Sequence, residues 1–157
     1  AIPIHILGNI YERFLGRVIV TTDKRARLEE KPEVRKAGGV YYTPEHIVRY
    51  LVQETVGRTI EGKSPGQIAG LRFLDPACGS GSFLLGVYDH LLRYHTEWYN
   101  ANRDKVKTGD CLTNADGTLQ LTLSKRREIL INNVYGVDKD PQAVEVAQLS
   151  LYLKLLE

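Results

Sequence analysis

The 157-residue sequence predicts a doubly wound α/β fold with a parallel sheet. Two short apolar runs, residues 71–74 and 134–137, are typical of buried strands, and a helical pattern follows each of them. A glycine-rich loop comes directly after the first run, and Asp138 ends the second. Ligands of open α/β sheets bind at the carboxyl ends of the strands, so we expect the loop and Asp138 to form one site.

The first part of the chain predicts a helix, a strand and a charged connection. Residues 6–15 carry apolar side chains at helical spacing, and residues 18–20 favour a short strand. Nine of the thirteen residues in 24–36 are charged, which favours a solvated linker, with a DNA-facing loop as the alternative. We therefore expect residues 1–37 to be the end of an N-terminal helical region with its linker, and residues 38–157 to be the ligand-binding domain.

Two helices are expected on either side of the first strand. Thr43 suits an N-cap and Pro44 the first helical position, and the apolar face that follows them ends at Gly57. After the glycine loop, residues 83–92 repeat apolar side chains with a period of 3.6 and predict a helix of about three turns.

The remaining elements surround the second strand. Residues 100–122 are polar and irregular, with a hairpin indicated at Asp116 and Gly117. Ser124 is the expected N-cap of the next helix, and Asp140 with Pro141 begins the last one. This last helix is apolar almost all round, so we expect it to be buried.

Composition excludes several classes of protein. Lys and Arg total 21 against 19 Asp and Glu, which is too balanced for a disordered tail or a mainly electrostatic nucleic-acid binder. The sequence shows neither an apolar run of ~20 residues nor a secretory signal. Cys78 and Cys111 are too few for a disulfide framework, and the histidines show no metal-ligand grouping. We expect a cytoplasmic protein without a metal or a membrane contact.

The ends of the sequence indicate a piece of a longer protein. The chain contains no Met, and it stops within the apolar run 149–156. We expect this run to leave an exposed apolar surface near the C-terminus, through which the piece self-associates.

The chemistry of the glycine loop favours a ligand without phosphate. Gly79 and Gly81 let the backbone approach a ligand, but Leu84 stands where a dinucleotide fingerprint has its third glycine. Asp75 at the mouth of the loop repels phosphates and suits an amino group. S-adenosylmethionine fits this site, and Asp138 is placed to accept hydrogen bonds from its ribose. A nicotinamide-dinucleotide-binding oxidoreductase domain remains the alternative.

Three motifs resemble those of the amino-methylating DNA methyltransferases. Residues 75–84 (DPACGSGSFL) resemble their motif I, residues 136–141 (GVDKDP) motif II, and residues 40–48 (VYYTPEHIV) motif X. Residues 7–16 resemble the helical segment upstream of the methyltransferase domain in type IIG restriction–modification enzymes. The resemblance implies a partial Rossmann-like, class I S-adenosylmethionine-dependent methyltransferase fold.

The resemblance also implies a role for most of the expected site residues. Thr43 would hold the methionine carboxylate, Asp75 the amino group and Asp138 the ribose. Pro44 would fix the turn before the helix, Phe83 would close the pocket, and the Lys139 stem would pack on the adenine. The full implied set is Tyr42, Thr43, Pro44, Asp75, Pro76, Ala77, Gly79, Gly81, Phe83, Asp138 and Lys139.

The catalytic motif of this family is absent from the sequence. Its members hold the flipped base with a Pro-Pro-Tyr or Pro-Pro-Phe motif, and the chain contains no Pro-Pro pair. We expect that motif beyond Glu157 and, for the whole protein, methyl transfer to double-stranded DNA, N6 of adenine being favoured. The piece alone is expected to be inactive. A protein or RNA methyltransferase and a non-catalytic interaction module stay as alternatives.

Overall fold

The computed structural model describes residues 17–22, 25–30 and 43–157. Within the first two ranges, β1 (Arg17–Thr22) and β2 (Arg25–Glu30) pair as an antiparallel hairpin. The strand expected at residues 18–20 is therefore confirmed, whereas the expected linker is wrong at its start, because residues 25–30 pair with β1. The helix expected at residues 6–15 and the domain boundary at residue 37 lie outside the described residues.

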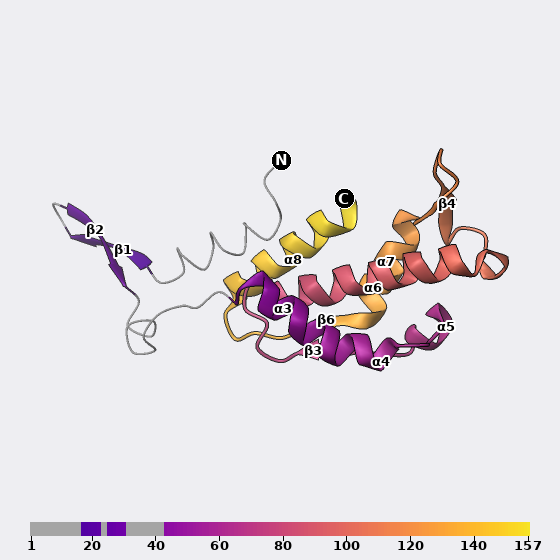
Figure 1. Ribbon diagram of the computed structural model, residues 1–157. Helices are drawn as coiled ribbons and strands as arrows, with labels where there is room; N and C mark the ends of the chain where they lie inside the picture. Colours follow the sequence, from indigo (N-terminus) through magenta and orange to yellow (C-terminus); the bar gives the residue numbers. More distant parts are fainter. Residues whose placement is uncertain (1–16, 23–24, 31–42) are drawn as a thin grey trace.

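The long helix α6 (Ser82–Ala101) is the centre of the remaining structure (Figure 1). One side of it contacts α3 (Glu45–Val52) and the π-helical turn η1 (Gln53–Gly57), which continues into α4 (Arg58–Ile60). Other sides contact α7 (Leu123–Asn133) and α8 (Pro141–Leu156). The fully buried side chains between these helices include Tyr88, Leu91 and Ile60. The twenty residues of α6 far exceed the three turns that the sequence predicted.

The helix before the first strand differs from its prediction at both ends. Pro44, and not Thr43, is the N-cap residue, and no side chain caps the helix. Gly57 does not end the helix, because the chain continues through the π-helical turn η1 to Ile60. A Cβ added at Gly86 would lie 2.7 Å from Val48 Cγ1, which shows how closely α3 packs on α6.

The strands β3 (Phe73–Asp75) and β6 (Val134–Gly136) form the predicted parallel pair. Phe73 pairs with Val134, and Asp75 pairs with Gly136, so the two strands end side by side. α6 covers this small sheet on one face, while Leu74 and Tyr135 stay exposed. The described residues thus show a mixed α/β architecture of two-stranded sheets and helices.

The polar insert contains the hairpin that the sequence indicated. It consists of η2 (Arg103–Lys105) and the antiparallel pair β4 (Cys111–Thr113) and β5 (Leu119–Leu121). The helix that follows begins two residues earlier than expected. Its N-cap is Thr122, whose hydroxyl accepts a hydrogen bond from Lys125 N at 3.1 Å, and not Ser124.

The last helix, α8, is only half buried, so the prediction that it is buried is wrong. It packs through its small residues Ala143, Ala147 and Ser150, which allow a close approach to the core. Among its large side chains, Leu155 is buried and Leu151 packs against the core, whereas Tyr152 and Leu156 are 62% and 70% exposed. The exposed apolar surface expected near the C-terminus is therefore present.

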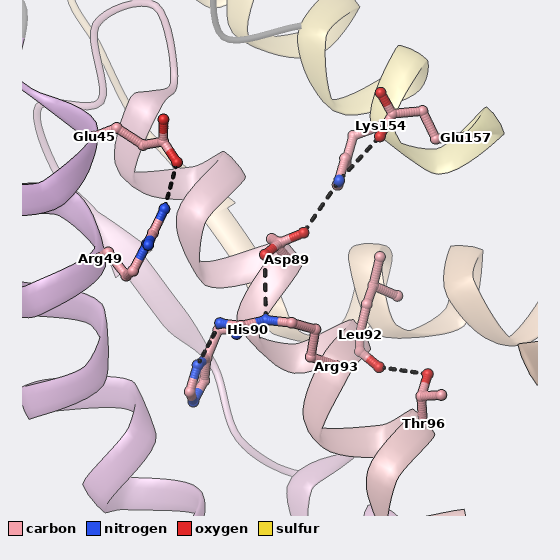
Figure 2. Close-up of polar contacts among 9 residues, drawn as sticks. All are labelled: Glu45, Arg49, Asp89, His90, Leu92, Arg93, Thr96, Lys154 and Glu157. Carbon is pink, nitrogen blue, oxygen red and sulfur yellow. Dashed lines mark hydrogen bonds and ion pairs between the residues drawn. The ribbon is translucent and has the colours of Figure 1, made fainter. Parts of the chain in front are cut away.

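An ion pair connects the C-terminal end of α8 to α6 (Figure 2). Lys154 Nζ lies 3.1 Å from Asp89 of α6 and 2.9 Å from Glu157. The Asp89 and Glu157 carboxylates raise the pKa of Lys154 against the opposing effect of its burial. Lys154 therefore stays charged, and its bonds complement the end of the helix.

One buried amide connects α7 to the segment before β3, which begins with α5 (Pro65–Ile68). Asn133 Nδ2 donates to the carbonyls of Ile68 and Leu71, both at 2.9 Å. We expect Asn133→Ala to lower the free energy of unfolding by about 1–3 kcal/mol, because it removes two hydrogen bonds that contribute about 0.5–1.5 kcal/mol each. Urea unfolding measures this, with Asn132→Ala on the same turn as the control. Equal losses from both variants would contradict the assignment.

Candidate functional site

The expected site lies at the end of the molecule where β3 and β6 finish and where α3, α6 and α8 begin (Figure 1). Main-chain hydrogen bonds hold the two connections together there. Val137 N donates to Asp75 O at 2.9 Å, and Cys78 N donates back to Val137 O at 3.0 Å. The glycine loop and the segment after β6 consequently form one rigid unit, with the N-termini of the helices beside it.

Asp138 is the main connection within this unit. Its Oδ2 accepts a hydrogen bond from Gly79 N at 2.8 Å, and its Oδ1 accepts one from Asp140 N at 2.9 Å. The bond from Asp140, followed by that from Gly79, holds the pKa of Asp138 below its usual range. Asp138 is therefore ionised at neutral pH and ties the glycine loop to the end of β6.

This arrangement corrects one part of the sequence-based interpretation. Asp140 caps α8 as expected, since its Oδ1 accepts from Gln142 N at 3.0 Å. The Asp138 carboxylate, which we expected to accept hydrogen bonds from a ribose, already accepts a main-chain N–H at each of its oxygens. An ionised carboxylate has about four acceptor positions, so a ligand has to share Asp138 with the loop.

Asp75 starts the glycine loop from the other strand. Its Oδ1 accepts a hydrogen bond from Ala77 N at 3.0 Å, a local turn that directs the chain away from β3. Burial raises the pKa of the Cys78 thiol, and the nearby Asp75 and Asp138 carboxylates raise it further. Cys78 thus lies within the field of both acids and stays a protonated, unreactive thiol.

Glycine is required at both of these loop positions, 79 and 81. Gly79 has φ +51° and Gly81 has φ +89°, conformations that side chains disfavour. A Cβ added at Gly81 would also lie only 2.8 Å from the Cβ of Ala147 in α8. Gly81 therefore has a packing role at the start of α6 that sequence reasoning did not find.

Gly136 is a further residue that the sequence analysis did not assign to the site. A Cβ there would lie 3.0 Å from Cys78 Sγ, so the last residue of β6 must lack a side chain for the loop to fold back over it. A glycine within an apolar strand is the signal that indicates such a close approach.

The other expected residues differ in where they lie. Thr43 is half-buried just before α3, and Pro44 O accepts from Ile47 N and Val48 N at 2.9 and 3.1 Å. Phe83 is partly buried and packs against the hydrophobic core. The exposed residues of the set are Pro44, Pro76, Ala77 and Lys139. Tyr42 lies outside the described residues.

A second concave region lies between η1, α4 and α6, away from the glycine loop. It has a volume of about 300 Å³, and its lining includes Gly57, His90 and Arg93. Its Arg93 is already engaged, since it lies 3.4 Å from Asp89 and 3.5 Å from His90 Nδ1 (Figure 2). This groove faces neither strand end, so we do not assign the site to it.

Two negative findings apply to residues 17–22, 25–30 and 43–157. None of the helices in these ranges is both long enough and apolar enough to span a membrane. The same ranges contain no group of three or more His, Cys, Asp or Glu side chains suited to holding a metal ion.

Comparison with known proteins associates the chain with DNA methyltransferases. The family described as MmeI, DNA-methyltransferase domain, matches residues 62–156. The type II restriction enzyme and methyltransferase RM.Eco57I of Escherichia coli is 36% identical over 97% of the chain and 15% of its own length. The adenine-specific methyltransferase PglX of Streptomyces coelicolor is 26% identical over 88% of the chain and 9% of its own length. The chain thus spans a small part of these relatives.

Proposed function

The chain belongs to the MmeI DNA-methyltransferase domain family, and from this we propose that it is the cofactor-binding part of a site-specific DNA methyltransferase. The whole protein would transfer a methyl group from S-adenosylmethionine to an exocyclic amine of double-stranded DNA, in a restriction–modification system. N6 of adenine is the favoured acceptor, because one relative is named as adenine-specific. β3 and β6 would be the first two strands of a Rossmann-like sheet.

The observation that carries this proposal is the position of the two carboxylates. Asp75 and Asp138 follow adjacent parallel strands, and the hydrogen bond from Gly79 to Asp138 keeps the glycine loop between them. Two acidic groups disfavour a pyrophosphate and suit a ligand that carries an ammonium group and hydroxyls. S-adenosylmethionine has both, and when bound it supplies an electrophilic methyl group on its sulfonium.

Each chain residue then has a binding or orienting task. Asp75 would accept hydrogen bonds from the ammonium group, and Asp138 would add the ribose hydroxyls to the main-chain amides it already holds. Thr43, before the N-terminus of α3, would hold the carboxylate, which the helix dipole also favours. The exposed Lys139 stem would cover the adenine, and Pro76 and Ala77 would line the loop.

The groups that activate the base amine belong to a Pro-Pro-Tyr-type motif, which the chain lacks. We propose that no catalytic residue is present here and that this motif lies beyond Glu157. Residues 43–157 would accordingly bind and orient the cofactor, while other parts of the protein hold most of the DNA.

Calorimetric titration of the chain tests the proposal directly. We expect S-adenosylmethionine to bind and NAD to show no binding under the same conditions. Asp75→Asn should weaken S-adenosylmethionine binding about tenfold or more, because a hydrogen bond to a charged group contributes about 1.5–3 kcal/mol. Asp89→Asn, an aspartate on α6 that contacts α8, is the control and should leave the affinity unchanged. Binding of NAD without binding of S-adenosylmethionine would overturn the proposal.

A further inference from the structure

The large apolar side chains that α8 leaves exposed lie along one side of the helix. Leu149, Tyr152 and Leu156 are each more than half exposed, and they are spaced three and four residues apart. Residues at this spacing are neighbours on a helix surface. We call this side the outer face of α8, defined by these three residues. Together they make a continuous apolar surface, which is typical of an interaction site.

A segment of the same chain has an apolar side of matching length. Residues 6–15, which lie outside the described residues, carry apolar side chains at the spacing of a helix. These side chains are Ile6, Leu7, Ile10, Tyr11, Phe14 and Leu15. A helix of ten residues would be about 15 Å long, and the outer face spans about 11 Å of α8. So short a helix is marginal in water by itself, so it requires a partner for its apolar side.

We propose that residues 6–15 pack as a helix against the outer face of α8 and antiparallel to it. Charge complementarity selects this direction. Glu145 is exposed and lies one turn before Leu149 on the same side of α8. Arg13 borders the apolar side of the predicted helix near its C-terminal end. An antiparallel helix brings Arg13 towards Glu145, whereas a parallel one would bring it towards the like charge of Lys154.

The connection between the segment and α3 is short enough for this arrangement. Arg17 pairs with Glu30, so the hairpin returns the chain to within about 5.5 Å of the point at which it leaves the segment. Residues 31–42 then complete the connection, and these twelve residues span at most about 43 Å. α3 and α8 begin at the same end of the molecule (Figure 1). An antiparallel helix ends towards that same end, where the connection has to arrive.

The same connection favours this segment over a second copy of the chain. A short flexible tether gives the segment an effective concentration of about millimolar. A second copy at micromolar concentration supplies its segment about a thousandfold more dilute. The chain's own segment thus covers the outer face in place of the self-association expected from the sequence. The contact would join the N-terminal region to residues 43–157, and it does not depend on the proposed function.

Hydrogen exchange of the intact chain, measured by mass spectrometry, tests the proposal. The amides of residues 6–15 should exchange slowly in the parent chain. Leu149→Glu/Tyr152→Glu should speed their exchange by about tenfold or more, because it replaces two apolar contacts with charges. Both side chains are exposed, so the amides of α6 should exchange as in the parent. Fast exchange of residues 6–15 in the parent, or no change in the variant, would overturn the proposal.

A control places the same charges on another exposed apolar surface. Tyr50→Glu/Leu51→Glu changes two exposed residues of α3 and should leave the exchange of residues 6–15 unchanged. Equal acceleration in this control would show that the segment does not select α8, contrary to the proposal. The measurement is repeated at several protein concentrations. Protection that increases with concentration would assign the segment to a second copy and refute the intramolecular contact.

A charge reversal tests the antiparallel direction. Arg13→Glu should speed the exchange of residues 6–15 by about two- to fivefold, because it places a second acid beside Glu145. Adding Glu145→Arg to that variant should restore the slower exchange of the parent. Acceleration that Glu145→Arg does not reverse would contradict the proposed arrangement.

Discussion

Asp138→Ala will weaken the binding of S-adenosylmethionine by about 10- to 100-fold, and it will also weaken the binding of a 2′,3′-dideoxy analogue that has no ribose hydroxyls. The N–H bond from Gly79 to this carboxylate contributes about 1.5–3 kcal/mol, which corresponds to this loss of affinity, and the bond from Asp140 is lost as well. The glycine loop then loses its connection to β6, whichever ligand is present. Calorimetric titration of both compounds measures the two effects.

The analogue is the decisive comparison in this experiment. A residue that only binds ribose would cost affinity for S-adenosylmethionine and nothing for the dideoxy analogue. Unchanged affinity for the analogue would therefore contradict a role for Asp138 in holding the loop. Asp140→Ala is the matched control, because its side chain caps α8 and should reduce stability by about 1 kcal/mol without a comparable loss of affinity.

The pH dependence of stability in Asp138→Asn, a variant that lacks the carboxylate charge, has a definite sign. The pKa of Asp138 lies below its ordinary value of 3.8 because main-chain amides stabilise the ionised form. A depressed pKa contributes stability that is present above the unfolded-state pKa and is lost as the pH falls through the folded-state pKa. The stability difference between the parent and Asp138→Asn should thus be full at neutral pH and shrink only in acid, below about pH 4.

Gly81→Ala should lower the free energy of unfolding by about 2–5 kcal/mol. A left-handed backbone costs a non-glycine residue about 1–2 kcal/mol, and overpacking costs about 1–3 kcal/mol more. Gly81 has φ +89°, and the new methyl group would lie 2.8 Å from Ala147 Cβ and 3.1 Å from its Cα. The backbone of α8 cannot move aside as the end of a flexible side chain would. Urea unfolding measures the loss.

Gly117→Ala is the matched control for this substitution. Gly117 has φ +82°, but nothing lies within 4 Å of the position that a Cβ would occupy. Gly117→Ala should therefore show the backbone cost alone, about 1–2 kcal/mol. The double variant Gly81→Ala/Ala147→Gly should recover part of the difference. If Gly81→Ala and Gly117→Ala cost the same, the contact with α8 is not the cause.

Local patterns predicted much of the fold and part of the site. The strand–loop–helix around residues 73–82, the parallel pairing with β6 and the Asp140 cap all depend on neighbouring residues or on general rules of α/β sheets. Prediction failed where a helix end is decided by packing. Gly57 was expected to end a helix, yet η1 continues through it because Val56 and Ile60 are buried on the same helical surface.

The prediction for α8 failed for a related reason. Its side chains are apolar on almost every face, and the sequence of the helix alone does not determine which face packs against the core. Gly81 at the start of α6 leaves room only for a small neighbour, so Ala147 is buried against it, while Tyr152 on another side of α8 is exposed. The side that packs is thus decided by the shape of the opposing surface.

The sequence by itself determined the family, the order of the elements and the residues at the carboxyl ends of the strands. Only the tertiary structure decided what those residues contact. Asp138 holds Gly79, which precedes it by 59 residues, and Gly81 lies against a helix that begins much later in the chain. Sequence motifs reflect the backbone conformations that neighbouring residues require. Contacts such as these two form only when packed elements bring distant parts of the chain together.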